Sequence, residues 1–159
     1  MAHDPVHDFD FFFGSWAVRH RQLKARLANC TAWIEFHGTC TAQPILGGAG
    51  NMDDNIIHKP DATYRAATLR TFDRATKQWA IWWFDGRMPH NPVDPPMKGS
   101  FTDGVGTFLA DETFEGKPIK VRFIWSRISP TFCQWEQAFS EDGGKSWETN
   151  WIMENTRMA

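Results

Sequence analysis

The sequence predicts an all-β fold, an antiparallel up-and-down β-barrel of about eight or more strands with a short N-terminal helical turn. Short runs rich in aromatic and β-branched residues alternate between apolar and polar positions, which is the periodicity of a strand. Clusters of Gly, Pro, Asp and Asn separate these runs, and no long segment keeps a helical period. A meander of such strands tends to close, because closure removes exposed sheet edges. A two-sheet sandwich is the alternative.

The elements follow in order along one domain, residues 1–159. The helical turn is expected at residues 9–13. The expected strands, which share the alternating pattern, are residues 15–23, 33–42, 64–72, 78–84, 99–109, 119–127, 133–140 and 147–156. Tight turns, such as Asp73-Arg74-Ala75-Thr76 and Ser129-Pro130, join neighbouring strands and make them antiparallel.

Two connections, residues 44–63 and 86–98, are predicted as long loops. Long loops in a compact barrel often form lids over its mouth. The alternative is a surface excursion stiffened by proline.

Composition excludes several classes of function. The net charge is −2 and the 17 Lys and Arg residues are scattered, so we expect no nucleic acid and no membrane as partner. Cys30, Cys40 and Cys133 form no C-x-x-C pair, and His3 and His7 lie beside Pro5 in a tail, so no metal site and no cofactor is predicted. The N-terminus lacks the pattern of a signal peptide, and the expected location is the cytoplasm.

Nine Trp and thirteen Phe residues against one Tyr make a heavy aromatic load, which can build a core or line a pocket. We predict that Trp16, His20, Trp83 and Trp151 contact a ligand in the cavity. Alternation from Trp16 through Val18 puts His20 on the Trp16 face. The alternative for the indoles is ordinary core packing.

His20, Glu35 and His37 are the candidate catalytic residues. Glu35 and His37 lie two positions apart on one expected strand and would form a coupled acid and base if both pointed inward. A solvated polar face is the favoured alternative. The chain shows no nucleophile elbow and no H-E-x-x-H motif, so no catalytic residue is assigned.

The segment from Ser140 to Trp147 resembles the Asp-box hairpin of β-propeller glycosidases. A propeller needs several four-stranded blades, whereas the motif occurs once in this chain. We therefore expect a structural role, in which Asp142 closes the turn and Trp147 anchors it by packing.

The segment Phe9-Asp10-Phe11-Phe12-Phe13-Gly14-Ser15-Trp16 resembles the first signature of the calycins, the lipocalin and fatty-acid-binding superfamily, with Gly14 and Trp16 as the matching positions. The whole chain is similar to uncharacterised bacterial calycin-like barrels. The resemblance implies a single calycin-like domain with a small-molecule pocket, and a late arginine over Trp16, which Arg157 or, less readily, Arg127 would supply.

These observations favour binding of a small apolar or aromatic molecule in the barrel cavity. The alternative is a small barrel enzyme, an isomerase, cyclase or hydrolase, that acts on an aromatic metabolite through His or Glu proton transfer. A third hypothesis is an interaction protein that buries aromatic surface in a homodimer.

Overall fold

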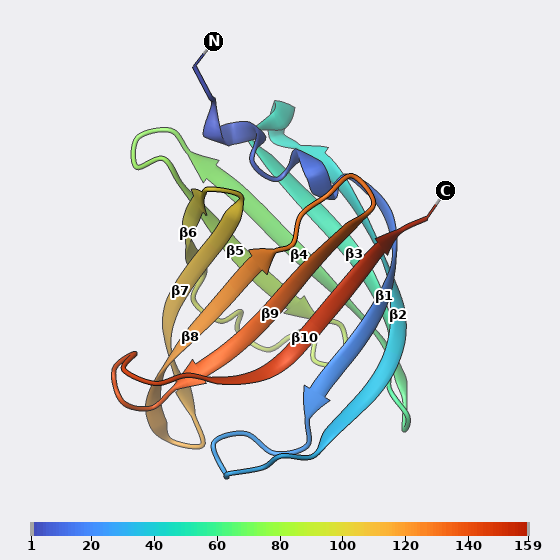
Figure 1. Cartoon of the computed structure of the whole chain (residues 1–159), viewed down its shortest axis with the longest axis vertical. Coiled ribbons are helices and arrows are strands. Elements are labelled where there is room, and N and C mark those ends of the chain that lie inside the picture. Colours follow the sequence, from blue (N-terminus) through green and yellow to red (C-terminus); the bar gives the residue numbers. More distant parts are fainter. Residues whose placement is uncertain (1, 159) are drawn as a thin grey trace.

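Ten antiparallel strands close into one barrel in the computed structural model, which describes residues 2–158 (Figure 1). Each strand pairs with its neighbours in sequence, and β1 pairs with β10 to complete the ring. The strands are β1 (Gly14–Leu23), β2 (Trp33–Ile45), β3 (Gly50–His58), β4 (Thr63–Asp73), β5 (Gln78–Asp85), β6 (Met97–Thr102), β7 (Val105–Phe114), β8 (Lys117–Ser126), β9 (Phe132–Ser140) and β10 (Glu148–Arg157). The predicted closed barrel is confirmed, and the sandwich is excluded.

Strand β3 lies within residues 44–63, so the prediction of a long loop there, whether as a lid or as a surface excursion, was wrong. It pairs with both β2 and β4 over most of its length. Its buried inward side chains are Asn51, Asp53, Asn55 and Ile57, and the first three of them are polar. The strand therefore lacks the apolar alternation that identifies its neighbours.

The expected strand 99–109 is instead a hairpin of β6 and β7. Asp103 and Gly104 form its two-residue turn, with left-handed φ angles of 51° and 78°. Asp-Gly is a favoured pair for such a turn. Because the alternating pattern continues on both sides of the turn, it concealed the chain reversal.

The N-terminal segment plugs one end of the barrel. Two short 3-10 helices, η1 (Pro5–His7) and η2 (Asp10–Phe12), cross that end (Figure 1). Phe9 is buried edge-on against Trp79, with ring centroids 4.9 Å apart, and the Trp16 indole donates a hydrogen bond to the carbonyl oxygen of Phe12 at 2.9 Å. Aromatic burial and this hydrogen bond hold the plug in place.

Arg157, at the end of β10, lies over Trp16 as the resemblance implied. Its guanidinium carbon is 4.2 Å from the ring centroid of Trp16. It also donates hydrogen bonds to the carbonyl oxygens of Phe11 at 2.7 Å and Phe13 at 2.6 Å, so it ties the plug to the last strand. Arg127 instead lies over the ring of Phe132.

The turn between β9 and β10 is the Asp-box-like segment. The Asp142 carboxylate accepts hydrogen bonds from the Ser140 hydroxyl at 2.8 Å and the Ser146 amide at 2.9 Å, and these bonds, with one from the Ser146 hydroxyl, lower the pKa of Asp142. Trp147 packs under Arg122, whose guanidinium carbon is 4.4 Å from the ring centroid. The contacts are those of a structural hairpin.

No helix within residues 2–158 is long and apolar enough to cross a membrane.

Candidate ligand-binding cavity

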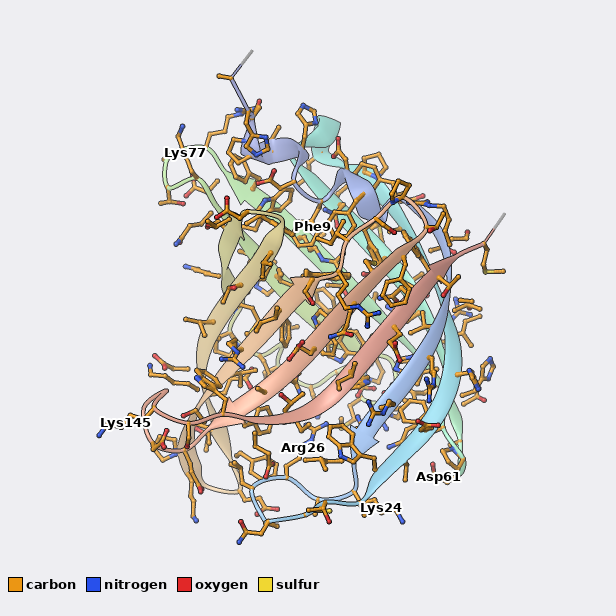
Figure 2. All side chains as sticks on the ribbon, in the orientation of Figure 1. Phe9, Lys24, Arg26, Asp61, Lys77 and Lys145 are labelled. Carbon is orange, nitrogen blue, oxygen red and sulfur yellow. The ribbon has the colours of Figure 1, made fainter. Side chains whose placement is uncertain are left out.

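A cavity of about 560 Å³ occupies the barrel interior. Phe12 and Trp125 line its closed end beneath the plug, whereas Arg26, Tyr64 and Arg87 line the end where the connections β1–β2, β3–β4 and β5–β6 lie. Phe9 and Arg26 mark these two ends in Figure 2. The volume lies within the range of roughly 300–1,000 Å³ that is usual for small-molecule sites.

The predicted loop at residues 86–98 forms part of the cavity rim. Met88, Pro89, Pro92, Val93 and Pro95 of this segment line the cavity. Its proline content restricts the backbone, so the rim has a defined shape although residues 86–96 form no strand.

Three indoles form an aromatic wall in the middle of the cavity. Trp151 meets Trp83 and Trp135 edge-on, with ring centroids 5.9 Å and 5.5 Å apart. Phe123 continues the wall beside Trp135 at 4.9 Å. These residues come from β5, β8, β9 and β10, and all line the cavity. Flat apolar surfaces of this kind favour an apolar or aromatic ligand.

His20 fixes the orientation of Trp151 from behind the wall. The Trp151 indole N–H donates to His20 Nδ1 at 3.1 Å, and the imidazole stacks on Phe36 at 4.8 Å between ring centroids. Burial lowers the pKa of His20 to about 4, with a smaller contribution from repulsion by His37. At neutral pH the ring is therefore uncharged, and Nδ1 remains an acceptor.

A buried polar network lies at the closed end of the cavity. Arg70 donates to Asp53 at 2.6 Å and to Asn51 at 2.9 Å, and the Arg70 and Asp53 side chains are only 4% and 3% exposed. Asp53 also accepts from the Asn55 amide at 2.6 Å and from the Thr68 backbone N–H at 3.2 Å. This set of contacts compensates two buried charges.

The network was not predicted, although Asp53, Asn55, Thr68 and Arg70 all line the cavity. Arg70 shares its face of β4 with Ala66 and Thr68, and all three are buried. An arginine at such a position is the one sequence signal that could have indicated a buried partner.

Among the carboxyl groups that line the cavity, that of Glu112 on β7 has the pKa that departs most from its ordinary value. Burial raises the pKa of Glu112 to about 7, and the nearby Asp94 carboxylate adds to the shift. Among residues 2–158, Glu112 forms no ion pair within 4.0 Å. Glu112 was not predicted as a site residue, because it lies beyond the end of the expected strand 99–109.

The four residues predicted to contact a ligand lie in two environments. Trp83 and Trp151 line the cavity, and their contact with a ligand remains a prediction. Trp16 lies between Phe12 and Arg157 at the plug, and His20 lies behind Trp151, so neither side chain lines the cavity. Alternation identifies the inward face of a strand, but not the depth at which each side chain lies.

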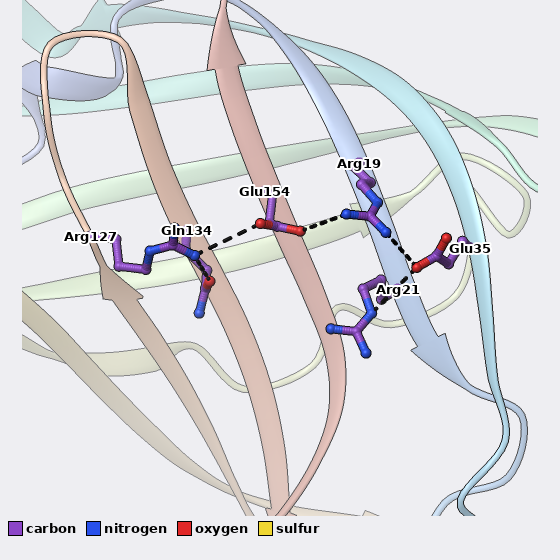
Figure 3. Close-up of polar contacts among 6 residues, drawn as sticks. All are labelled: Arg19, Arg21, Glu35, Arg127, Gln134 and Glu154. Carbon is purple, nitrogen blue, oxygen red and sulfur yellow. Dashed lines mark hydrogen bonds and ion pairs between the residues drawn. The ribbon is translucent and has the colours of Figure 1, made fainter.

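Glu35 and His37 point to the outside of the barrel. Both are exposed, and Glu35 accepts a hydrogen bond from Arg19 at 2.7 Å. Arg19 also reaches Glu154 at 3.5 Å, so the contacts run across β2, β1 and β10 on the outer face (Figure 3). The inward orientation that a coupled acid and base would need is therefore not met, because the polar face of β2 is the solvated one.

Comparison with known proteins informs the fold. No family model matches the chain, and no curated protein matches it. Among solved structures the chain is similar to the S-type phycobiliprotein lyase CPES from Guillardia theta, with a TM-score of 0.62 and 9% sequence identity, over 95% of this chain and 90% of that chain. At this identity the likeness shows the fold alone. The shared fold is a closed antiparallel barrel.

Proposed function

We propose that this barrel binds a small apolar or aromatic molecule in its cavity. The observation that carries the proposal is the wall formed by Trp83, Trp135 and Trp151 around a cavity of about 560 Å³. Trp151 is held by His20, so the wall is formed before any ligand arrives. Preorganised surface costs little ordering entropy on binding.

Trp83→Ala should weaken binding of the neutral fluorophore N-phenyl-1-naphthylamine about tenfold, because it removes one face of the aromatic wall. Titration followed by probe fluorescence, with excitation of the protein indoles, measures the affinity. Trp82→Ala is the matched control, since Trp82 is the preceding residue of β5 and does not line the cavity. Absence of binding by the wild-type protein, or equal affinities of both variants, would contradict the proposal.

A second candidate function is proton transfer to or from the bound molecule, and Glu112 favours it. A carboxyl whose pKa lies near 7 can exchange a proton at neutral pH, and Glu112 lines the cavity. A turnover screen of aromatic substrates with wild-type and Glu112→Gln proteins tests this candidate. Loss of turnover with unchanged affinity for N-phenyl-1-naphthylamine would support it, and equal turnover would exclude this role for Glu112.

Glu112 should also make the folded state less stable as pH rises. Its pKa is higher in the folded protein, about 7, than the ordinary value of 4.5, so its contribution is most favourable below pH 4.5 and is lost as pH rises through about 7. Urea denaturation of wild-type and Glu112→Gln proteins at several pH values measures the difference in free energy of unfolding. A difference that does not change between pH 4.5 and 8 would show that the carboxyl titrates normally.

A further inference from the structure

Arg26 brings a partly buried positive charge to the open end of the cavity. It lies in the connection between β1 and β2 and lines the cavity, and its guanidinium carbon is 5.3 Å from the ring centroid of Phe139. The side chain is therefore directed over the aromatic interior instead of into bulk solvent (Figure 2).

No anion of the described chain neutralises Arg26. Among residues 2–158 it forms no ion pair within 4.0 Å. Burial lowers the pKa of Arg26, and attraction to Tyr64 and Glu148 opposes this shift only in part. Glu148 already accepts a hydrogen bond from the Leu27 backbone N–H at 2.7 Å. A charge removed from water without a partner is costly, so an anion that entered here would be stabilised.

The other charged side chains that line the cavity at this end are either basic or acidic. Arg87 also lines the cavity, but it is neutralised by Asp85 at 2.7 Å and stacks on Tyr64. Lys59 lines the cavity and, like Arg26, forms no ion pair within residues 2–158.

Glu112 and Asp94 make up the acidic group. Asp94 raises the pKa of Glu112, whereas neither Arg26 nor Lys59 contributes to that shift. Within residues 2–158 neither carboxyl forms an ion pair within 4.0 Å with the basic group, Arg26 and Lys59, so the basic group is available to a ligand.

We propose that the ligand is an aromatic acid whose carboxylate pairs with Arg26 while its ring system lies against Trp83, Trp135 and Trp151. A guanidinium matches the two oxygens of a carboxylate, and such charge-assisted bonds are among the stronger hydrogen bonds. Lys59, in the connection between β3 and β4, adds a second positive charge at the same end of the cavity. This inference rests on the proposed function and specifies its ligand class.

The test compares 2-naphthoate with the neutral 2-naphthamide, which has the same ring system, by calorimetry at neutral pH. We expect 2-naphthoate to bind about tenfold or more tightly than the amide. Arg26→Gln should remove this preference, whereas Arg26→Lys should keep part of it. Arg21→Gln is the matched control, because Arg21 also packs on an aromatic ring, that of Trp33 at 5.1 Å, and does not line the cavity. The control should keep the full preference.

N-phenyl-1-naphthylamine binding separates failure of this inference from failure of the proposed function. If the neutral fluorophore binds but 2-naphthoate shows no advantage over the amide, or neither naphthyl compound binds, the aromatic-acid assignment is wrong. It is also wrong if the preference survives Arg26→Gln. If none of the three compounds binds, the proposed binding function fails as well.

Discussion

Asp53→Asn is expected to lower the free energy of unfolding by about 3–5 kcal/mol, because it removes one partner of a buried ion pair. Asp53 accepts from Arg70 at 2.6 Å, and both side chains are almost wholly excluded from solvent. The substitution preserves size but leaves the Arg70 guanidinium buried against Phe9 and Trp125 without its anion. Urea denaturation at neutral pH measures the loss.

Asp54→Asn provides a control on the same strand. Asp54 pairs with Arg65 at the same 2.6 Å, but both side chains are 59% exposed. Water and salt screen such a pair, so its loss should cost about 0–1 kcal/mol. Similar losses for the two variants would show that burial does not set the contribution of the Asp53–Arg70 pair.

Asp53 also illustrates why part of the fold could not be predicted from the sequence. Strands such as β1 and β2 alternate clearly over most of their length, because every second side chain is buried. On β3 three inward positions carry Asn51, Asp53 and Asn55, and Arg70 of β4 donates to the first two and supplies the charge that compensates Asp53. That compensation depends on the register between the two strands, which a single sequence does not display.

The candidate site, like the fold, could be predicted only in part from the sequence. Two of the four residues predicted to contact a ligand, Trp83 and Trp151, line the cavity, and the aromatic content indicated that rings could line the interior. The sequence does not distinguish these two indoles from that of Trp16, which is buried on its strand but lies under the plug and does not line the cavity. Arg26 lies in a connection without periodicity, so only its position in space reveals that it faces the cavity.

His20 is expected to make the protein lose stability in acid. Its pKa falls from the ordinary 6.5 to about 4 on folding, so the neutral form is favoured in the folded state. The corresponding stability is fully present above pH 6.5 and is lost as pH falls through about 4, and the shift corresponds to about 3 kcal/mol. Comparing the free energies of unfolding of wild-type and His20→Gln proteins from pH 4 to pH 7.5 isolates this contribution.

His37→Gln is the control for this titration, since His37 lies on the outer face and contributes only the smaller repulsive part of the His20 shift. The wild-type protein and this variant should therefore show nearly the same acid dependence, and a parallel acid loss in His20→Gln would contradict the assignment. Protonation of His20 Nδ1 removes the acceptor for the Trp151 indole N–H. Binding of N-phenyl-1-naphthylamine should consequently weaken in the same acid range, because the residue that orients the cavity wall then carries a charge.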